Sequence, residues 1–204
     1  RAEKVCAVEV DERLLPILRE TVGEHKNLHI IHGDILKCDI KKLIEEELGG
    51  LKIAVCANLP YYITTPILMY LLESGADIET ITVMVQKEVA DKLEAKVGTR
   101  EAGAITVAVN FYGTVEKLFS VSRGSFMPAP NVDSAVIQIK TGGKWREAVN
   151  DQKHFFKMVR AGFQQRRKTL VNSLSGIMGY NKAELSDILK NLGISENVRI
   201  EALS

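Results

Sequence analysis

The feature that most constrains the fold of this 204-residue chain is a regular alternation of short apolar runs with amphipathic segments in its first half. The apolar runs are rich in Val and Ile and have the length of buried strands; they lie at residues 4–10, 28–32, 52–57 and 80–86. Segments with helical spacing follow them at residues 14–22, 41–48, 67–72 and 88–95. Such alternation is typical of βαβ units, so we expect a parallel sheet with helices on both faces.

Three residues near helix starts carry specific expectations. Asp11 precedes the first helical segment and is expected to be its N-cap. Pro16 falls early in that helix and is expected to cost it one hydrogen bond. Pro66 is expected at the first position of the third helix, where a missing N–H does no harm.

The pattern changes after residue 103. A helix is expected at 104–111, followed by two strands, 115–121 and 132–140, that suit an antiparallel edge pair. A Thr-Gly-Gly linker at 141–143 ends the strand signals, and helices are expected at 155–163, 169–174 and 182–192. Asn181 with Glu184 forms the N-cap signature of the last helix. We therefore expect an α/β domain at 1–143 and a small helical domain at 144–204.

Composition narrows the class of protein without indicating a partner. Hydrophobic residues make up 46% of the chain, which excludes disorder as its main state, and no run of about 18 apolar residues predicts a membrane-spanning helix. The 27 Lys and Arg residues balance the 26 Asp and Glu residues, so net charge neither demands nor excludes a nucleic acid. The three cysteines and four histidines lack metal-site spacing; we expect a cytoplasmic protein with reduced thiols and no bound metal.

Ligands of open α/β sheets bind beyond the carboxyl ends of the strands, and acidic residues lie at two of those ends here. Glu9 ends the first strand, where a carboxylate can accept both hydroxyls of a ribose. Asp34 ends the second, where it can accept an adenine amino group while Ile35 and Leu36 pack against the ring. Either acid alone is also explained as an exposed strand-end residue beside a turn.

The third strand end is more specific, because it reads Asn58-Leu59-Pro60-Tyr61. The amino nitrogen of adenine is a poor nucleophile, since its lone pair is delocalised into the ring. The Asn58 side-chain oxygen and a backbone carbonyl near Leu59 or Pro60 can accept its two N–H bonds, which favours a pyramidal nitrogen and stabilises the developing positive charge. Tyr61 can stack on the base. A helix-initiating turn with a core aromatic is the simpler alternative.

With these motifs in this order, the chain resembles the ribosomal RNA adenine N6,N6-dimethyltransferases, whose bacterial members act on small-subunit (16S) rRNA. The matching segments span nearly the whole chain: VEVDERL (8–14), GDIL (33–36), NLPYYITTP (58–66), FMPAPNVDSAV (126–136) and FQQRRKTLVNSL (163–174). The resemblance implies a Rossmann-like methyltransferase sheet and S-adenosyl-L-methionine as cofactor. It further implies that Glu9 binds the cofactor ribose and that Asp34 binds its adenine. It assigns catalysis to the motif that begins at Asn58, and the second face of the target base to Phe126.

The chain departs from the family in one respect. The glycine-rich G-x-G-x-G loop that holds the methionine part of the cofactor is missing before the first strand. We therefore expect a chain truncated at both ends, with a sheet that lacks a central strand and leaves apolar groups uncovered. Such a chain is expected to bind cofactor weakly, to be inactive and to self-associate, whereas the full-length protein is expected to be a monomer.

Basic side chains provide candidate RNA contacts. Arg123 lies just before the loop that carries Phe126, and the densest basic run lies near the end of the helical segment 155–163. We expect phosphate contacts from Arg123, Arg160, Arg166, Arg167 and Lys168. Residues 87–100 carry a second, weaker basic patch. A solvated helix face is the alternative for the basic run, and a hydrophobic plug inside the domain is the alternative for Phe126.

The predicted function is N6,N6-dimethylation of two adjacent adenines near the 3′ end of 16S rRNA, in the immature 30S subunit. The QRRKTL segment (165–170) favours this function over that of the large-subunit rRNA adenine methylases, which share fold and motif. A non-catalytic RNA-binding assembly factor of the same fold is a third hypothesis. The presence of Glu9, Asp34 and Asn58 argues against it, whereas the missing glycine loop argues for it.

Overall fold

The computed structural model describes residues 2–143, 145–177 and 179–203. Its strands are β1 (Val5–Glu9), β2 (Leu28–His32), β3 (Ile53–Asn58), β4 (Ile78–Gln86), β5 (Gly113–Val121) and β6 (Ser134–Thr141). Its helices are α1 (Leu14–Val22), α2 (Ile40–Leu48), α3 (Thr64–Glu73), α4 (Lys87–Glu94), α5 (Ala104–Tyr112), α6 (Trp145–Ala148), α7 (Gln152–Gln164), α8 (Leu170–Leu174) and α9 (Lys182–Asn191). Four short 3-10 helices complete the fold: η1 (Ile35–Lys37), η2 (Tyr61–Ile63), η3 (Arg123–Ser125) and η4 (Ile200–Ala202).

The strands form two separate sheets. β1 and β2 make a parallel pair, and the other four strands follow the order β3-β4-β6-β5. β3 and β4 are parallel, whereas β6 runs antiparallel to both of its neighbours. The predicted βαβ pattern and the antiparallel pairing of β5 with β6 are therefore confirmed. Of the strands β5 and β6, which were expected to form an edge pair, β5 lies at an edge of the sheet and β6 lies between β4 and β5.

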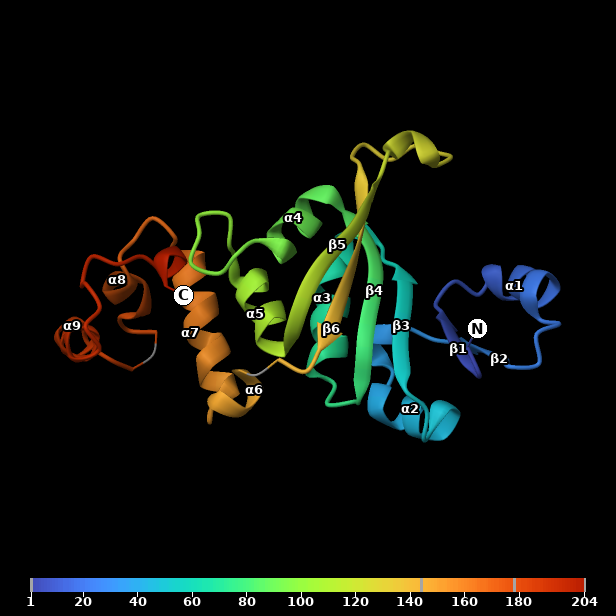
Figure 1. Cartoon of the computed structure of the whole chain (residues 1–204), viewed down its shortest axis with the longest axis horizontal. Helices are drawn as coiled ribbons and strands as arrows, with labels where there is room; N and C mark the ends of the chain where they lie inside the picture. Colours follow the sequence, from blue (N-terminus) through green and yellow to red (C-terminus); the bar gives the residue numbers. More distant parts are fainter. Residues whose placement is uncertain (1, 144, 178, 204) are drawn as a thin grey trace.

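The expected gap in the sheet lies between β1 and β3. In the described residues no strand joins these two, and Figure 1 shows the β1–β2 pair set apart from the four-stranded sheet. Val5 is 40% exposed in β1, and Ala54 and Cys56 are exposed on one face of β3. Small and apolar side chains that a continuous sheet would bury thus face solvent at this position, as predicted.

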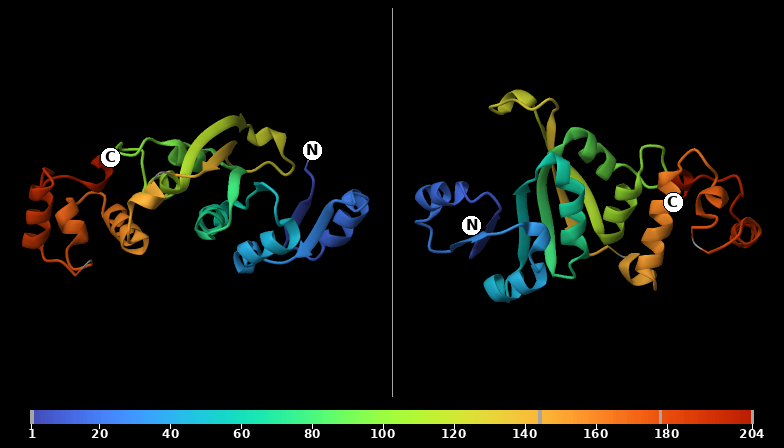
Figure 2. Two further views of the ribbon diagram at one scale, coloured as in Figure 1. Left: turned by 60° about the horizontal axis from the view of Figure 1, so that its bottom comes forward. Right: turned by 180° about the vertical axis from the view of Figure 1, so that it is seen from behind.

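The main core lies between the four-stranded sheet and helices α3, α4 and α5, which cover the face of the sheet turned toward the viewer in the right-hand view of Figure 2. β4 turns alternate side chains into this core, as its period of two requires: Ile81, Val83 and Val85 are all at most 1% exposed. Leu68 of α3 packs in the same cluster. This packing fixes the carboxyl ends of β3 and β4, where the predicted site lies.

A second, smaller hydrophobic cluster is formed by α8, α9 and the end of α7. Helix α7 contributes to both clusters, since Phe156 belongs to the main core and Ala161 to the second. The Phe156 ring lies 5.0 Å from that of Phe111 and 5.8 Å from that of Tyr112. The helical part of the chain is thus attached to the sheet part through an aromatic contact at the start of α7.

Of four expectations about helix starts, the structure corrects three and confirms one. Arg13, not Asp11, is the N-cap of α1, because the helix begins only at Leu14. Pro16 is consequently the third residue of α1, where its N–H would lack a helical partner anyway, so it costs no hydrogen bond. Pro66 is likewise the third residue of α3 and not the first. The capping box of Asn181 and Glu184 at α9 is confirmed.

Candidate active site

The motif that begins at Asn58 forms a tight turn between β3 and α3. The Leu59 N–H donates to the carbonyl of Met84 at 3.3 Å, which ties the turn to β4, and the Leu59 side chain is only 5% exposed. The Asn58 side chain is exposed and makes no hydrogen bond within the described residues. Its carboxamide is therefore free to bind a ligand.

The two backbone carbonyls after Asn58 differ in availability. The Pro60 carbonyl already accepts the N–H of Ile63 at 3.2 Å and the hydroxyl of Thr64 at 3.0 Å. The Leu59 carbonyl accepts no hydrogen bond within the described chain. Of the two carbonyls considered from the sequence, the structure leaves that of Leu59 for a ligand.

Tyr61 is held from a distant part of the sequence. Its hydroxyl lies 2.6 Å from that of Ser134, 73 residues further on, and the Ser134 side chain is fully buried. Tyr61 itself is half-buried, whereas the neighbouring Tyr62 is 85% exposed. The phenol of Tyr61 is thus anchored to β6 while its ring remains at the surface.

The catalytic motif and Phe126 line one cavity of about 340 Å³. Asn58, Leu59, Pro60 and Tyr61 form one side, and Phe126 comes with two prolines from the β5–β6 loop, which projects beyond the sheet in Figure 1. Phe126 is partly exposed and belongs to neither buried hydrophobic cluster. The structure therefore brings together two motifs that lie more than sixty residues apart in the sequence.

Glu9 and Asp34 lie together at the carboxyl edge of the smaller sheet. Glu9 pairs with His32 across the strands, and the N–H of Gly33 donates to the Glu9 carbonyl at 2.9 Å. One carboxylate oxygen of Glu9 accepts the N–H of Asp11 at 2.8 Å, and one of Asp34 accepts a backbone N–H two residues on at 3.0 Å. Neither acid lines the cavity at Asn58.

Ile35, predicted to contact a cofactor ring, is only partly buried and packs with Leu36 against the main core. Both belong to η1, which lies against α3. The Ile35 side chain therefore packs against the core in this structure, next to the sheet edge that carries Asp34.

The predicted basic residues have different surroundings. The Arg166 guanidinium donates to Glu201 at 3.0 Å and to the carbonyl of Arg100 at 2.5 Å, and it lies 5.7 Å from the ring centre of Phe163. It therefore joins the turn after α7 to η4 and to the loop after α4. Three others are exposed and make no side-chain contact of this kind in the described residues: Arg160, Arg167 and Lys168.

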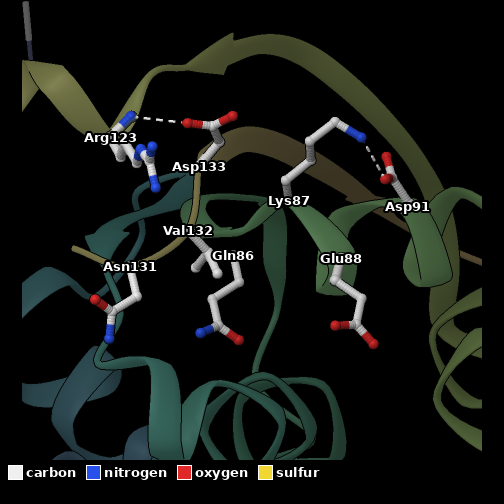
Figure 3. A pocket seen from close by; sticks show the side chains of 8 residues that line it. All are labelled: Gln86, Lys87, Glu88, Asp91, Arg123, Asn131, Val132 and Asp133. Carbon is white, nitrogen blue, oxygen red and sulfur yellow. Dashed lines mark hydrogen bonds and ion pairs between the residues drawn. The ribbon is translucent and has the colours of Figure 1, made fainter.

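Arg123 lines a second, larger cavity of about 520 Å³, shown in Figure 3. The other lining residues are Gln86, Lys87, Glu88, Asp91, Asn131, Val132 and Asp133. The sequence did not single out Gln86, Asn131 or Ser134. Asn131 and Ser134 lie inside a matched motif, but only the fold shows that Asn131 shares a cavity with Gln86 and that Ser134 binds Tyr61.

All residues from 1 to 204 match the model of one family, described as ribosomal RNA adenine dimethylase. The chain belongs to this family. Two similar proteins are both called ribosomal RNA small subunit methyltransferase A. That of Clostridioides difficile (strain 630) is 47% identical over 203 residues, covering 100% of this chain and 70% of the relative. That of Bacillus mycoides (strain KBAB4) is 48% identical over 208 residues, covering 100% and 71%.

Two solved structures agree with the family's fold. A dimethyladenosine transferase from Plasmodium falciparum superposes with a TM-score of 0.80 at 23% identity, covering 100% of this chain and 78% of that one. The 23S rRNA methyltransferase ErmE gives a TM-score of 0.69 at 25% identity, with the same two coverages. The Rossmann-like methyltransferase fold expected from the sequence is therefore confirmed, as is the enzyme class.

None of the described helices is long and apolar enough to cross a membrane. Over residues 2–143, 145–177 and 179–203, no group of three or more His, Cys, Asp or Glu side chains is arranged to hold a metal ion.

Proposed function

We propose that this protein transfers methyl groups from S-adenosyl-L-methionine to the N6 atoms of two adjacent adenines near the 3′ end of 16S rRNA, within the immature 30S subunit. The observation that carries the proposal is the cavity in which the free Asn58 carboxamide, the free Leu59 carbonyl and the Tyr61 and Phe126 rings converge. The names of the relatives that are 47–48% identical support the small-subunit substrate.

The acceptor pair explains how an adenine amino group becomes reactive. Its two N–H bonds donate to the Asn58 side-chain oxygen and to the Leu59 carbonyl, since the Pro60 carbonyl is occupied. Both acceptors favour a pyramidal nitrogen and stabilise the positive charge that grows as the N–C bond forms. The surplus proton leaves to water, and no covalent enzyme intermediate is required.

The two aromatic rings hold the base during transfer. Tyr61, anchored through Ser134, stacks on one face of the adenine, and Phe126 covers the other. Stacking of a base on an aromatic side chain contributes about 1–3 kcal/mol. This contribution offsets the cost of unstacking the adenine from its neighbours.

Two acids at the β1–β2 edge provide a donor set that fits the nucleoside part of S-adenosylmethionine. Glu9 has one carboxylate oxygen without a partner in the described residues, suited to ribose hydroxyls, and Asp34 accepts the adenine amino group beside Ile35. When bound, the cofactor supplies an electrophilic sulfonium methyl group. These acids determine its orientation and contribute no proton transfer.

The rest of the chain positions the RNA. We assign residues 1–143 to a catalytic domain and 144–204 to a helical RNA-contacting domain, which the two hydrophobic clusters support. Exposed cations on both parts, Arg123, Arg160, Arg167 and Lys168, contact phosphates. Arg166 orients the two parts through Glu201 and the Arg100 carbonyl. A cytoplasmic monomer is the state in which the intact protein would act.

Replacing Asn58 tests the proposal. In the full-length protein, Asn58→Ala should lower the rate of methyl transfer to immature small subunits by roughly 10²-fold, the scale for losing one transition-state acceptor. Asn191→Ala, an exposed amide at the end of α9, is the matched control and should keep the wild-type rate. A near-wild-type rate for Asn58→Ala contradicts the assigned chemistry.

The two alternative functions predict different results in the same assay. A large-subunit methylase, favoured only by the likeness to ErmE, would methylate protein-free 23S rRNA and leave small subunits unchanged. A non-catalytic assembly factor would bind small subunits with no transfer in either wild type or variant.

A further inference from the structure

The cavity that contains Arg123 is not used by the reaction described above. At about 520 Å³ it is within the range of small-ligand sites, and it opens beside the start of α4. Its lining combines two neutral amides with charged groups, and Val132 is its apolar member (Figure 3). Such a lining is suited to a ligand that has both a hydrogen-bonding edge and a charge.

This cavity shares its framework with the catalytic one. Asn58 pairs with Met84 across β3 and β4, and Gln86 lies two residues further along β4, about 7 Å away at the rise of a strand. Gln86 pairs in turn with Ser134, the residue that binds the Tyr61 hydroxyl. Two nucleotides that are joined by one phosphodiester bond could therefore occupy the two cavities at the same time.

The β5–β6 loop also contributes to both cavities. It supplies Phe126 and two prolines to the catalytic cavity, and Asn131 and Val132 to the second. A single strand of RNA that places its target base against Phe126 would thus continue over Asn131. The loop thus places the two cavities one after the other along the course of a single RNA strand.

The acidic groups of α4 are already neutralised. Asp91 binds Lys87 at 2.7 Å and Lys117 at 3.1 Å, and Glu88 binds Lys92 at 2.7 Å. These lysines hold the pKa of both carboxyl groups below their usual values. They leave little net negative charge on the α4 side of the cavity, so Asp133 is the lining carboxylate that has no ion-pair partner among the described residues.

Arg123 is the cation that remains available. Its backbone N–H donates to Asp133 at 2.9 Å, which fixes the loop, whereas its guanidinium has no ion-pair partner among the described residues. A guanidinium presents paired donors that match two phosphate oxygens. It therefore provides an anion contact at the mouth of the cavity.

Gln86 and Asn131 supply the remaining specificity. Neither side-chain amide makes a hydrogen bond within the described residues, and in Figure 3 both extend to the same side, below the loop that carries Arg123. Each amide offers both donors and an acceptor, the combination that reads the edge of a nucleobase. Single-stranded RNA is recognised through such contacts to unstacked bases.

We propose that this cavity binds the nucleotide that adjoins the target adenine in the same RNA strand. Its base lies on the amides of Gln86 and Asn131, and its phosphate binds the Arg123 guanidinium. The proposal rests on the proposed function for the identity of the polymer. On this proposal the second cavity recognises the base next to the target, and it thereby determines which adenine of the strand enters the catalytic cavity.

The test uses the full-length protein and three short single-stranded RNAs. One carries the target adenine with both neighbours, and each of the others has an abasic nucleotide on one side of it. Binding is followed by fluorescence anisotropy and methyl transfer is measured separately. Wild type should bind one of the abasic RNAs about tenfold more weakly than the intact RNA, the scale for losing one base contact.

Variants assign that loss to the cavity. Gln86→Met combined with Asn131→Leu should weaken binding of the intact RNA about tenfold and cause no further loss with the sensitive abasic RNA. Arg123→Ala should weaken all three RNAs alike and reduce the salt slope by about one. Asn191→Leu, the same chemical change outside the cavity, should behave as wild type.

The outcomes separate this inference from the proposed function. Equal wild-type binding of all three RNAs, or an undiminished preference for the intact RNA in the double variant, overturns the nucleotide site. Discrimination in binding with no methyl transfer to any RNA or subunit would overturn the proposed function and leave the site standing.

Discussion

The hydrogen bond between the Tyr61 and Ser134 hydroxyls can be removed from either side with little change in side-chain volume. Its length is 2.6 Å, Ser134 is fully buried and Tyr61 is half-buried. Ser134→Ala deletes one oxygen from the core and leaves the phenol without its protein partner. Tyr61→Phe deletes the phenol hydroxyl and keeps the ring that stacks on the base.

The size of the effect follows from these surroundings. A typical net hydrogen bond contributes about 0.5–1.5 kcal/mol to stability, and a fully buried unsatisfied partner costs about 1–3 kcal/mol. Water can reach the half-buried phenol, so we expect a loss near the lower end, about 1 kcal/mol for Ser134→Ala. If the bond holds the Tyr61 ring in place, a similar loss should appear in kcat/KM, where about 1.4 kcal/mol is a factor of ten.

A double-mutant cycle distinguishes a positioning role from simple destabilisation. Urea denaturation gives the stability of the two single variants and of the double variant, and methyl transfer to small subunits gives kcat/KM. If the hydroxyls act together, the double variant should lose no more than the worse single variant, with a coupling of about 1 kcal/mol in both measurements. Additive losses, or a coupling in stability with none in kcat/KM, would refute the positioning of Tyr61 by Ser134.

Three other predictions concern the helical part and the α4 surface. Arg167→Ala combined with Lys168→Ala should weaken binding of small subunits and lower the salt slope by about two, measured by titration at several salt concentrations, because both side chains are exposed. Gly162→Ala should destabilise the protein by about 1–3 kcal/mol in urea, because the added methyl group would lie 2.7 Å from Ile200. The pKa of Asp91 is lowered by its lysine partners, so its stabilising effect is present above its ordinary pKa and lost as pH falls through the lowered one. Asp91→Asn should thus be less stable than wild type at neutral pH, and urea curves of the two proteins should converge as pH falls through the lowered pKa of Asp91.

The most reliable sequence signals were local ones. The short apolar run at residues 80–86 predicted β4, because such a run has the composition and length of a buried strand. Asn181 and Glu184 predicted the start of α9, because both halves of a capping box lie within four residues. The motif that begins at Asn58 likewise carries its chemistry in consecutive residues, so its position at a strand end could be predicted before the fold was known.

The first residue of a helix was more difficult to predict than its presence, because a cap and an interior position are separated by only one turn of chain. Asp11 has the residue type of an N-cap. Its carboxylate, however, accepts hydrogen bonds from the backbone N–H and the guanidinium of Arg13, and α1 begins at Leu14. The effect of Pro16 depends on that start. Moving the helix start by two residues, from residue 12 to Leu14, turns the expected loss of a hydrogen bond into no loss.

The sequence by itself determined the class of fold, the identity of the reactive turn and the family, because these depend on side chains that are near one another along the chain. Only the tertiary structure decided which partners those side chains meet. Ser134 binds Tyr61 from 73 residues away, and Arg166 binds Glu201 and the Arg100 carbonyl from 35 and 66 residues away. The cavities at Asn58 and Arg123 arise for the same reason: packing brings a strand end and a distant loop together, and no local pattern records which residues will face each other across the space between them.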